Sequence, residues 1–403
     1  MQVLRKAIKS YRRRGLLWTL HRSLEKLYFF GLTLRRRTRL FFLARIEAVA
    51  IARGNRKRFR ILSYRWHVAH QYELYKLPSI VTLVDDLETR VTRAWDFGQR
   101  PLPENVVFRP WRAIDVKQFD LAILHFDENV LAPENTHGAL GPDWGAAFRF
   151  LMENVRLPKI AICHGTPQFH GQYDFNYKGE DLLQVIEATR RQLVAYLGDT
   201  VVVCNSHQAA EEWGFERSKV IWHGFDPQEF PVALYQRGIL SPLGPAVMSR
   251  PHYRGYFLYR EVFDSFPPEF APSTLSVREP WHWRFGNSYA RAKFKNYVDE
   301  IRRYSVYFNP TMRSPMPRAR GEAMMCGLVT VNAHNHDVDC FIRNSVNGFY
   351  SNDVRELREY LLYLMRNPDV ARRVGAEGRK TAIATFHIDR YLADWQALIR
   401  ATI

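Results

Sequence analysis

The chain has 403 residues, of which 46% are apolar, and it carries a formal net charge of +17. This length and apolar content suit two globular domains with full cores and exclude a disordered or fibrous protein. The four cysteines have no paired spacing, and no apolar run approaches the roughly 20 residues of a membrane-spanning helix, which argues against a disulfide scaffold, a zinc site and an integral membrane protein.

The positive charge is concentrated at the amino end of the chain. Residues 1–58 contain 17 Lys and Arg against only Glu25 and Glu47, whereas the remainder is nearly neutral. Arginine clusters at 12–14 and 35–37 alternate with leucines and aromatic residues, a pattern typical of a helix that lies in an anionic membrane surface. Two alternatives stay open: a helical arm packed on the protein's own body, and a nucleic-acid-binding segment. The near-neutral body and the lack of an aromatic-basic recognition module argue against nucleic acid.

From residue 59 onward, short apolar segments rich in valine and isoleucine alternate with longer segments. We predict strands over 59–64, 80–84, 121–125, 159–163, 200–204 and 219–222, and helices between several of them, such as 145–153 and 181–197. Alternation of this kind is typical of an open, parallel α/β sheet.

A second α/β set follows a predicted linker over 226–245, where prolines occur and periodicity is weak. Its predicted strands are 246–249, 305–309, 328–332 and 348–350, and its predicted helices are 256–265, 354–366 and 389–399. We therefore divide the chain into a basic helical segment (1–58), a first α/β domain (59–235), a second α/β domain (236–385) and a C-terminal helix (386–403) that crosses back to the first. The two α/β domains are expected to face each other across a cleft.

Polar residues follow two strands of the first domain. Ligands of open α/β sheets bind at the carboxyl ends of the strands, so Arg65 and His67 after the first strand, and His164 after KIAIC, are candidate binding residues. His170 and Asp174 continue the loop from His164. The alternatives are a histidine that bonds only to the backbone, for His164, and ordinary surface polarity for the others.

Two arginines follow the first strand predicted in the second domain. Arg250 and Arg254 stand four positions apart after PAVMS and can converge on one diphosphate through charge-assisted hydrogen bonds. The alternative is a solvated helix face that pairs with Glu261.

The segment YFNPTMRSPMPRARGEAMMCGLVTV reads as strand, proline-rich loop, short helix and strand. Pro317 suits a first helical position, and Gly327 suits the position just past a helix end. Arg313, Arg318 and Arg320 crowd the start of that helix, where the helix dipole disfavours cations, so we predict a bound anion there. Glu322 lies one turn further on and either reaches the same ligand or only caps the helix.

Together these motifs resemble the nucleotide-sugar glycosyltransferases of GT-B fold, specifically the retaining family-4 type. The segment VVVCNSHQAAEEWGFERSKVIWHGFDPQEF resembles the end of that family's first domain, and MSRPHYRGY stands in the place of its basic phosphate-binding pair. PMPRARGEAMMCGLVTV resembles its donor-site helix, and NSVNGFYSNDVRELREYLLYLMRNPDVARRVGAEGRKTA its C-terminal region. The likeness covers much of residues 159–400.

The resemblance implies two Rossmann-like domains, of which 59–235 would bind the acceptor and 236–385 the donor. It implies that Glu322 binds the ribose hydroxyls, that Arg250 and Arg254 neutralise the diphosphate, and that His164 lies beside the transferred sugar. His164, Arg250 and Glu322 are the predicted catalytic residues. The predicted donor site also contains Arg254, Ser314, Met316, Pro317, Arg318 and Arg320, and the predicted acceptor site contains Arg65, His67, His170 and Asp174.

One position departs from the family pattern. The family commonly has a further Glu eight positions before Glu322, and this chain has Ser314 there. The loop over 313–317 must therefore hold the donor sugar in another way, for example through backbone N–H groups.

We therefore predict a retaining glycosyltransferase that moves a sugar from a nucleoside-diphosphate sugar to a glycan or lipid-linked acceptor in cell-surface polysaccharide synthesis. Arginines and a helix dipole would stabilise the leaving diphosphate, so no metal or other cofactor is expected. Since no signal peptide is visible, we expect a cytoplasmic protein that binds the inner membrane face through residues 1–58 and has no nucleic-acid partner. The alternative, which Ser314 favours, is a catalytically impaired nucleotide-binding or scaffold protein of the same fold.

Overall fold

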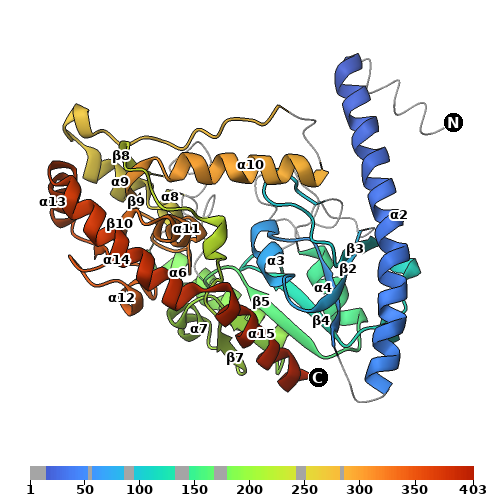
Figure 1. The fold of residues 1–403 in the computed structure, drawn as a ribbon. Coiled ribbons are helices and arrows are strands. Elements are labelled where there is room, and N and C mark those ends of the chain that lie inside the picture. The colour runs from blue at the N-terminus through green and yellow to red at the C-terminus, as the bar shows by residue number, and fades with distance from the viewer. Residues whose placement is uncertain are drawn as a thin grey trace.

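The structure is a computed structural model that describes residues 15–52, 57–85, 95–131, 145–167, 179–241, 251–281 and 286–403. In this part of the chain, two parallel β-sheets lie side by side, each accompanied by helices (Figure 1). We call the seven-stranded sheet with its helices the first lobe, and the four-stranded sheet with its helices the second lobe.

The sheet of the first lobe has the strand order β3-β2-β1-β4-β5-β6-β7, with parallel pairing throughout. Its strands are β1 (Phe59–Tyr64), β2 (Ser79–Val84), β3 (Val106–Arg109), β4 (Leu121–Phe126), β5 (Lys159–Cys163), β6 (Val201–Cys204) and β7 (Ser218–Val220). The six predicted strands are confirmed to within two residues at either end. The prediction missed β3, since its four residues follow a proline-containing stretch and carry little periodicity.

Helices connect four successive pairs of these strands, as is usual for parallel neighbours. They are α3 (Val68–Leu74), α4 (Ala146–Asn154), α6 (Gly179–Leu197) and α7 (His207–Trp213). Phe148 of α4 and Trp213 of α7 are fully buried against the apolar faces of β4, β5 and β6. The burial explains why these strands are almost uninterrupted apolar runs.

The sheet of the second lobe has the order β11-β10-β9-β8, again parallel. Its strands are β8 (Arg237–Leu240), β9 (Tyr304–Asn309), β10 (Val329–Ala333) and β11 (Phe349–Ser351). The predicted linker over 226–245 is wrong in part, because β8 lies inside it. A strand of four residues that begins Arg-Gly gave no periodic signal. The predicted strand over 246–249 lies outside the described residues.

The second lobe contains most of the remaining helices: α8 (Pro251–Arg254), α9 (Tyr256–Phe263), α10 (Gly286–Ile301), α11 (Arg318–Cys326), α12 (Val338–Phe341), α13 (Val354–Arg366) and α14 (Pro368–Phe386). The last helix, α15 (Ile388–Thr402), extends beside the first lobe (Figure 1). There Tyr391, Trp395 and Ile399 join the apolar core of the seven-stranded sheet.

A helix of 37 residues, α2 (Leu16–Ala52), stands along the β3 edge of the first sheet (Figure 1). Arg37 donates through Nε and Nη2 to the Phe108 carbonyl at 3.1 and 2.9 Å, and Leu40 is buried against Ile80 and Val107. Glu47 is buried and accepts the Lys57 N–H. One face of this basic helix therefore packs on the body, as one of the alternatives held. No described helix combines the length and the apolar character needed to cross a bilayer.

The four cysteines are free thiols in the structure. Cys163, Cys204 and Cys326 are buried, and Cys340 is exposed. The prediction of buried, unpaired thiols is confirmed for three of them.

Candidate functional site

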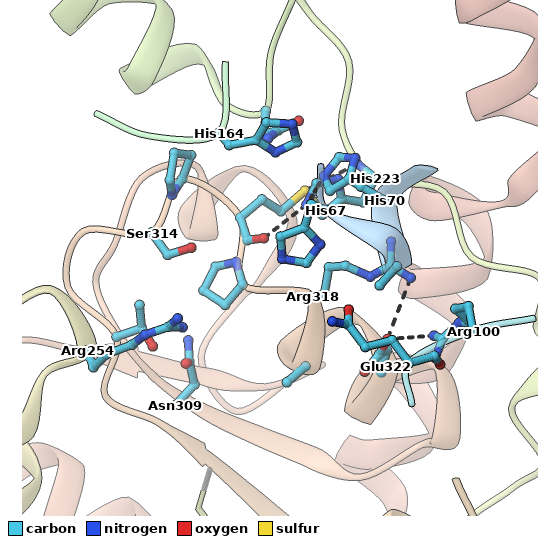
Figure 2. Close-up of a pocket in the computed structure, with 18 of the residues that line it drawn as sticks. His67, His70, Arg100, His164, His223, Arg254, Asn309, Ser314, Arg318 and Glu322 are labelled. Carbon is cyan, nitrogen blue, oxygen red and sulfur yellow. Dashed lines mark hydrogen bonds and ion pairs between the residues drawn. The ribbon is translucent and has the colours of Figure 1, made fainter. Parts of the chain in front are cut away.

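A cavity of about 650 Å³ lies between the lobes, at the carboxyl ends of the strands (Figure 2). The first lobe lines it with Trp66 and His67 after β1 and with His164 after β5. The second lobe lines it with Asn309 at the end of β9 and with the start of α11. The loops that follow these strands therefore face each other across one shared cavity, as the sheet topology predicts.

The loop between β9 and α11 forms one wall of the cavity. It contributes Ser314, Met316 and Pro317, and α11 contributes Arg318 and Glu322. Pro317 was predicted at the first helical position but occupies the N-cap, one residue before the helix begins at Arg318, and Gly327 ends the helix in the left-handed conformation with φ +81°. The first turn of a nine-residue helix thus borders the cavity, where the positive end of the helix dipole favours an anion.

Arg254 approaches the same wall from α8. Gly255, with φ +73°, ends this short helix, and a Cβ there would lie 1.6 Å from the Pro310 carbonyl oxygen. The Tyr253 carbonyl accepts the N–H groups of Met312 and Arg313 at 3.2 and 3.3 Å. These bonds fix Arg254, whose exposed side chain lines the cavity, beside the loop that carries Ser314.

A chain of alternating charges joins the two lobes along one side of the cavity. Lys76 lies 2.8 Å from Glu73, and Arg318 lies 3.5 Å from Glu73 and 3.5 Å from Glu322. Arg100, from the loop before β3, lies 3.2 Å from Oε1 of Glu322 (Figure 2). The side chains of Glu73, Arg100 and Glu322 are at most 5% exposed. We call these five residues the charge chain. Glu322 therefore lines the cavity while it is held by cations from both lobes.

Histidines of the first lobe gather on the opposite side of the cavity (Figure 2). The cluster consists of His67, His70, His125, His164 and His223. Nδ1 of His125 lies 3.0 Å from Nε2 of His164, and Nε2 of His125 lies 3.1 Å from the amide nitrogen of Gln71. Nδ1 of His125 and Nε2 of His164 share one hydrogen bond, in which the protonated nitrogen donates to the unprotonated one.

The histidines are neutral near pH 7. Desolvation, with the Arg318 and Arg254 charges nearby, lowers the pKa of His67 to about 4. Burial lowers the pKa of His125 to about 3 and also lowers the pKa values of His70, His164 and His223. Neutral imidazoles offer one donor and one acceptor each, which suits hydroxyl groups.

Most of the predicted site residues that the structure describes line this one cavity. They are His67, His164, Arg254, Ser314, Met316, Pro317, Arg318 and Glu322. Arg250 lies outside the described residues, and so do His170 and Asp174.

Two predicted site residues do not line the cavity. Arg320 is 1% exposed, and its guanidinium lies over the Phe341 ring at 5.0 Å, because the α11 residue two positions after Arg318 faces the core of the second lobe. Arg65 lies 4.0 Å from Asp96, while its neighbours Trp66 and His67 face the cavity. Donor binding by Arg320 and acceptor binding by Arg65 are therefore corrected to structural roles.

Several cavity residues were missed by the sequence analysis. Arg100 gave no signal, since it follows an irregular segment. Tyr307 and Asn309 were read as ordinary strand residues, although a polar pair at the end of a buried strand is itself a signal. Asp127 and Glu128 directly follow β4 and line the cavity, and they could have been found by the strand-end rule used for His164. The glycine at position 165 leaves room for the Glu128 carboxylate, since a Cβ there would lie 1.9 Å from it.

No protein-family model matches this sequence, and no curated protein sequence matches it. The structure is similar to several solved structures. Sucrose-phosphate synthase from Thermosynechococcus elongatus has a TM-score of 0.57 and 12% identity, with 86% of this chain and 99% of that chain covered. Anabaena Alr3699/HepE in complex with UDP-glucose has a TM-score of 0.54 and 13% identity, with 85% and 100% covered. A glycosyltransferase from Rickettsia africae ESF-5 has a TM-score of 0.53 and 12% identity, with 86% and 98% covered.

These similarities confirm the predicted fold. The chain has the α/β GT-B architecture, with two parallel-sheet lobes that face a shared cavity.

Proposed function

We propose that this protein is a glycosyltransferase that transfers a sugar from a nucleoside-diphosphate sugar to a glycan or lipid-linked acceptor in cell-surface polysaccharide synthesis. The observation that carries the proposal is the cavity itself, in which Arg254 and the first turn of α11 stand on the same wall as Glu322. A guanidinium and a helix N-terminus match a diphosphate, and a carboxylate matches ribose hydroxyls. HepE, a protein of the same fold, was solved with UDP and with UDP-glucose.

The difficult step in such a transfer is the departure of the diphosphate, which gains negative charge as the glycosidic bond breaks. Arg254 and the N–H groups at the start of α11 would stabilise that charge without reorganisation, because the Tyr253 carbonyl and the loop after β9 already hold them in place. We expect no metal requirement, since these groups supply the positive charge. Retention of the anomeric configuration is expected from the family resemblance alone.

The histidine side of the cavity would bind the sugar and the acceptor. The rings of His164 and His67 are stacked and line the cavity, where each neutral imidazole would offer one donor and one acceptor to sugar hydroxyls. Ser314 adds no charge to the opposite wall. This part of the cavity would therefore bind sugar hydroxyl groups through hydrogen bonds with uncharged donors and acceptors.

The function is tested by a thermal-shift and calorimetric titration with nucleoside diphosphates, followed by a turnover assay with the sugar form of the nucleotide that binds. We expect a nucleoside diphosphate to raise the melting temperature and bind with micromolar affinity, and its sugar form to release that nucleoside diphosphate when an acceptor glycan is added. Binding without turnover across a panel of acceptors would favour the scaffold alternative. No binding of any nucleoside diphosphate would contradict the proposal.

We also propose that α2 holds the protein on the anionic inner face of a membrane. Its outward face is apolar: Leu20, Leu27, Leu34 and Phe41 recur every seven residues, and each is more than 40% exposed. Leu16, Leu24, Phe30, Phe42, Ile46 and Val49 extend this surface. Its exposed neighbours Lys26, Arg35, Arg39 and Arg45 are cations, and Glu47, one of the two acids of the helix, is buried against the body. Like charges along the helix disfavour a second copy as the partner and favour an anionic lipid surface.

Replacing Leu27, Leu34 and Phe42 with serine should weaken binding to vesicles of mixed neutral and anionic lipid by about 100-fold or more, because each buried apolar side chain contributes roughly 1.5 kcal/mol or more. Cosedimentation measures the partition. Leu183→Ser with Leu234→Ser is the control, since both side chains are exposed but lie away from α2. Wild-type protein that ignores anionic vesicles, or that forms a dimer lost in the triple variant, would contradict membrane docking.

A further inference from the structure

The floor of the cavity holds three polar atoms that have no partner within the described part of the protein. They are the hydroxyl of Tyr307 and both amide atoms, Oδ1 and Nδ2, of Asn309. Asn309 is fully buried and Tyr307 is 2% exposed, yet both residues line the cavity. They stand two positions apart on β9, so their side chains lie on the same face of the strand.

An adjacent strand provides a direct comparison. Asn332 of β10 is the register partner of Asn309 across the sheet and is equally buried. Its amide nitrogen donates to Oγ1 of Thr330 at 3.1 Å and to the Phe349 carbonyl at 3.0 Å. The two asparagines at the same level of one sheet therefore differ at the amide nitrogen: Nδ2 of Asn332 makes two hydrogen bonds and only its Oδ1 lacks a partner among the described residues, whereas both amide atoms of Asn309 lack one.

Leaving buried hydrogen-bonding groups unpaired destabilises a protein, so such groups in a cavity wall point to a ligand that completes them. An amide needs an acceptor and a donor at once. Asn309 lies beside Arg254 (Figure 2). Burial and the nearby Glu322 charge raise the pKa of Tyr307. The two polar groups thus line the same cavity as the Arg254 cation and the Glu322 carboxylate.

We propose that Tyr307 and Asn309 form a binding ledge for the ribose and diphosphate portion of a nucleoside diphosphate. Asn309 Nδ2 donates to a phosphate oxygen that Arg254 also contacts, and Oδ1 accepts a ligand hydroxyl. Tyr307 bonds to a ribose hydroxyl beside Glu322. The assignment rests on the proposed function. It adds two uncharged residues that would bind the nucleoside diphosphate through hydrogen bonds alone.

The ledge is tested by calorimetric titration with UDP and by thermal unfolding of the ligand-free protein. Asn309→Leu should raise the Kd for UDP at least tenfold, and Tyr307→Phe should raise it about three- to tenfold. Both variants should also melt at a higher temperature than the wild type when ligand-free, because each removes unpaired buried polar atoms. A loss of binding with a gain in stability distinguishes a ligand-binding role from a structural one.

Asn332→Leu is the matched control, and it should melt at a lower temperature while its UDP affinity stays within twofold of the wild type. The ledge is overturned if Asn309→Leu binds UDP as the wild type does, or if it destabilises the ligand-free protein as Asn332→Leu does. A wild type that binds neither UDP nor any other nucleoside diphosphate overturns the proposed function and the ligand assigned here. The melting temperatures of Asn309→Leu and Asn332→Leu would still report independently whether the Asn309 amide is unpaired.

Discussion

Replacing Arg254 with methionine should lower the turnover of the nucleotide sugar by about 10²–10³-fold, which corresponds to about 2.7–4 kcal/mol of lost transition-state stabilisation. The side chain lines the cavity beside the loop of Ser314, where the leaving diphosphate is expected, and methionine keeps most of its volume without its charge. Affinity for the free nucleoside diphosphate should fall at least tenfold. Release of the nucleoside diphosphate measures the first effect, and calorimetry measures the second.

The fold itself should tolerate this change. Arg254 is exposed, so the ligand-free variant should unfold within about 0.5 kcal/mol of the wild type. Arg260→Met is the matched control, since Arg260 is an exposed arginine of the next helix, α9, and does not line the cavity. An Arg254→Met variant with wild-type affinity for nucleoside diphosphates would remove Arg254 from the diphosphate site.

Replacing Glu322 with leucine should destabilise the protein by about 3–5 kcal/mol and abolish nucleotide binding. In the charge chain the carboxylate lies between Arg318 and Arg100, and its loss leaves the Arg100 guanidinium, only 5% exposed, without its ion-pair partner. Removing one member of a buried ion pair costs this much because the remaining charge has lost its hydration as well as its partner. Denaturant unfolding of the ligand-free protein measures the change.

Two further variants separate the buried pair from ordinary surface charge. Glu104→Leu breaks the ion pair with Arg39, whose side chains are 77% and 60% exposed, and should change stability by less than about 1 kcal/mol. Arg100→Leu combined with Glu322→Leu should recover much of the stability lost in Glu322→Leu, because no unpaired charge remains. Equal stabilities of the single and the double variant would contradict a direct coupling of Arg100 with Glu322.

The position of the strands could be predicted because the signal is local. β5 is apolar after Lys159, and the run of apolar residues in β1 is interrupted only by Arg60 and Ser63, so both were placed to the residue. β3 and β8 were not found, since four residues beside prolines or a glycine carry too little periodicity. The cavity wall was predictable for the same reason, because the loop after β9 and the helix α11 lie within one short stretch of sequence.

Amino-acid order therefore specified the two parallel sheets, the strand ends where a ligand would bind, and the chemistry of the wall that holds Arg254, Ser314 and Glu322. Which side chains meet across the lobes depends on packing between segments far apart in the chain. Arg100 and Glu322 are separated by 222 positions, and no local pattern relates them. The same holds for Arg320. Its position at the start of α11 predicted a place in the anion site, but in the folded lobe its side chain packs against Phe341 in the core.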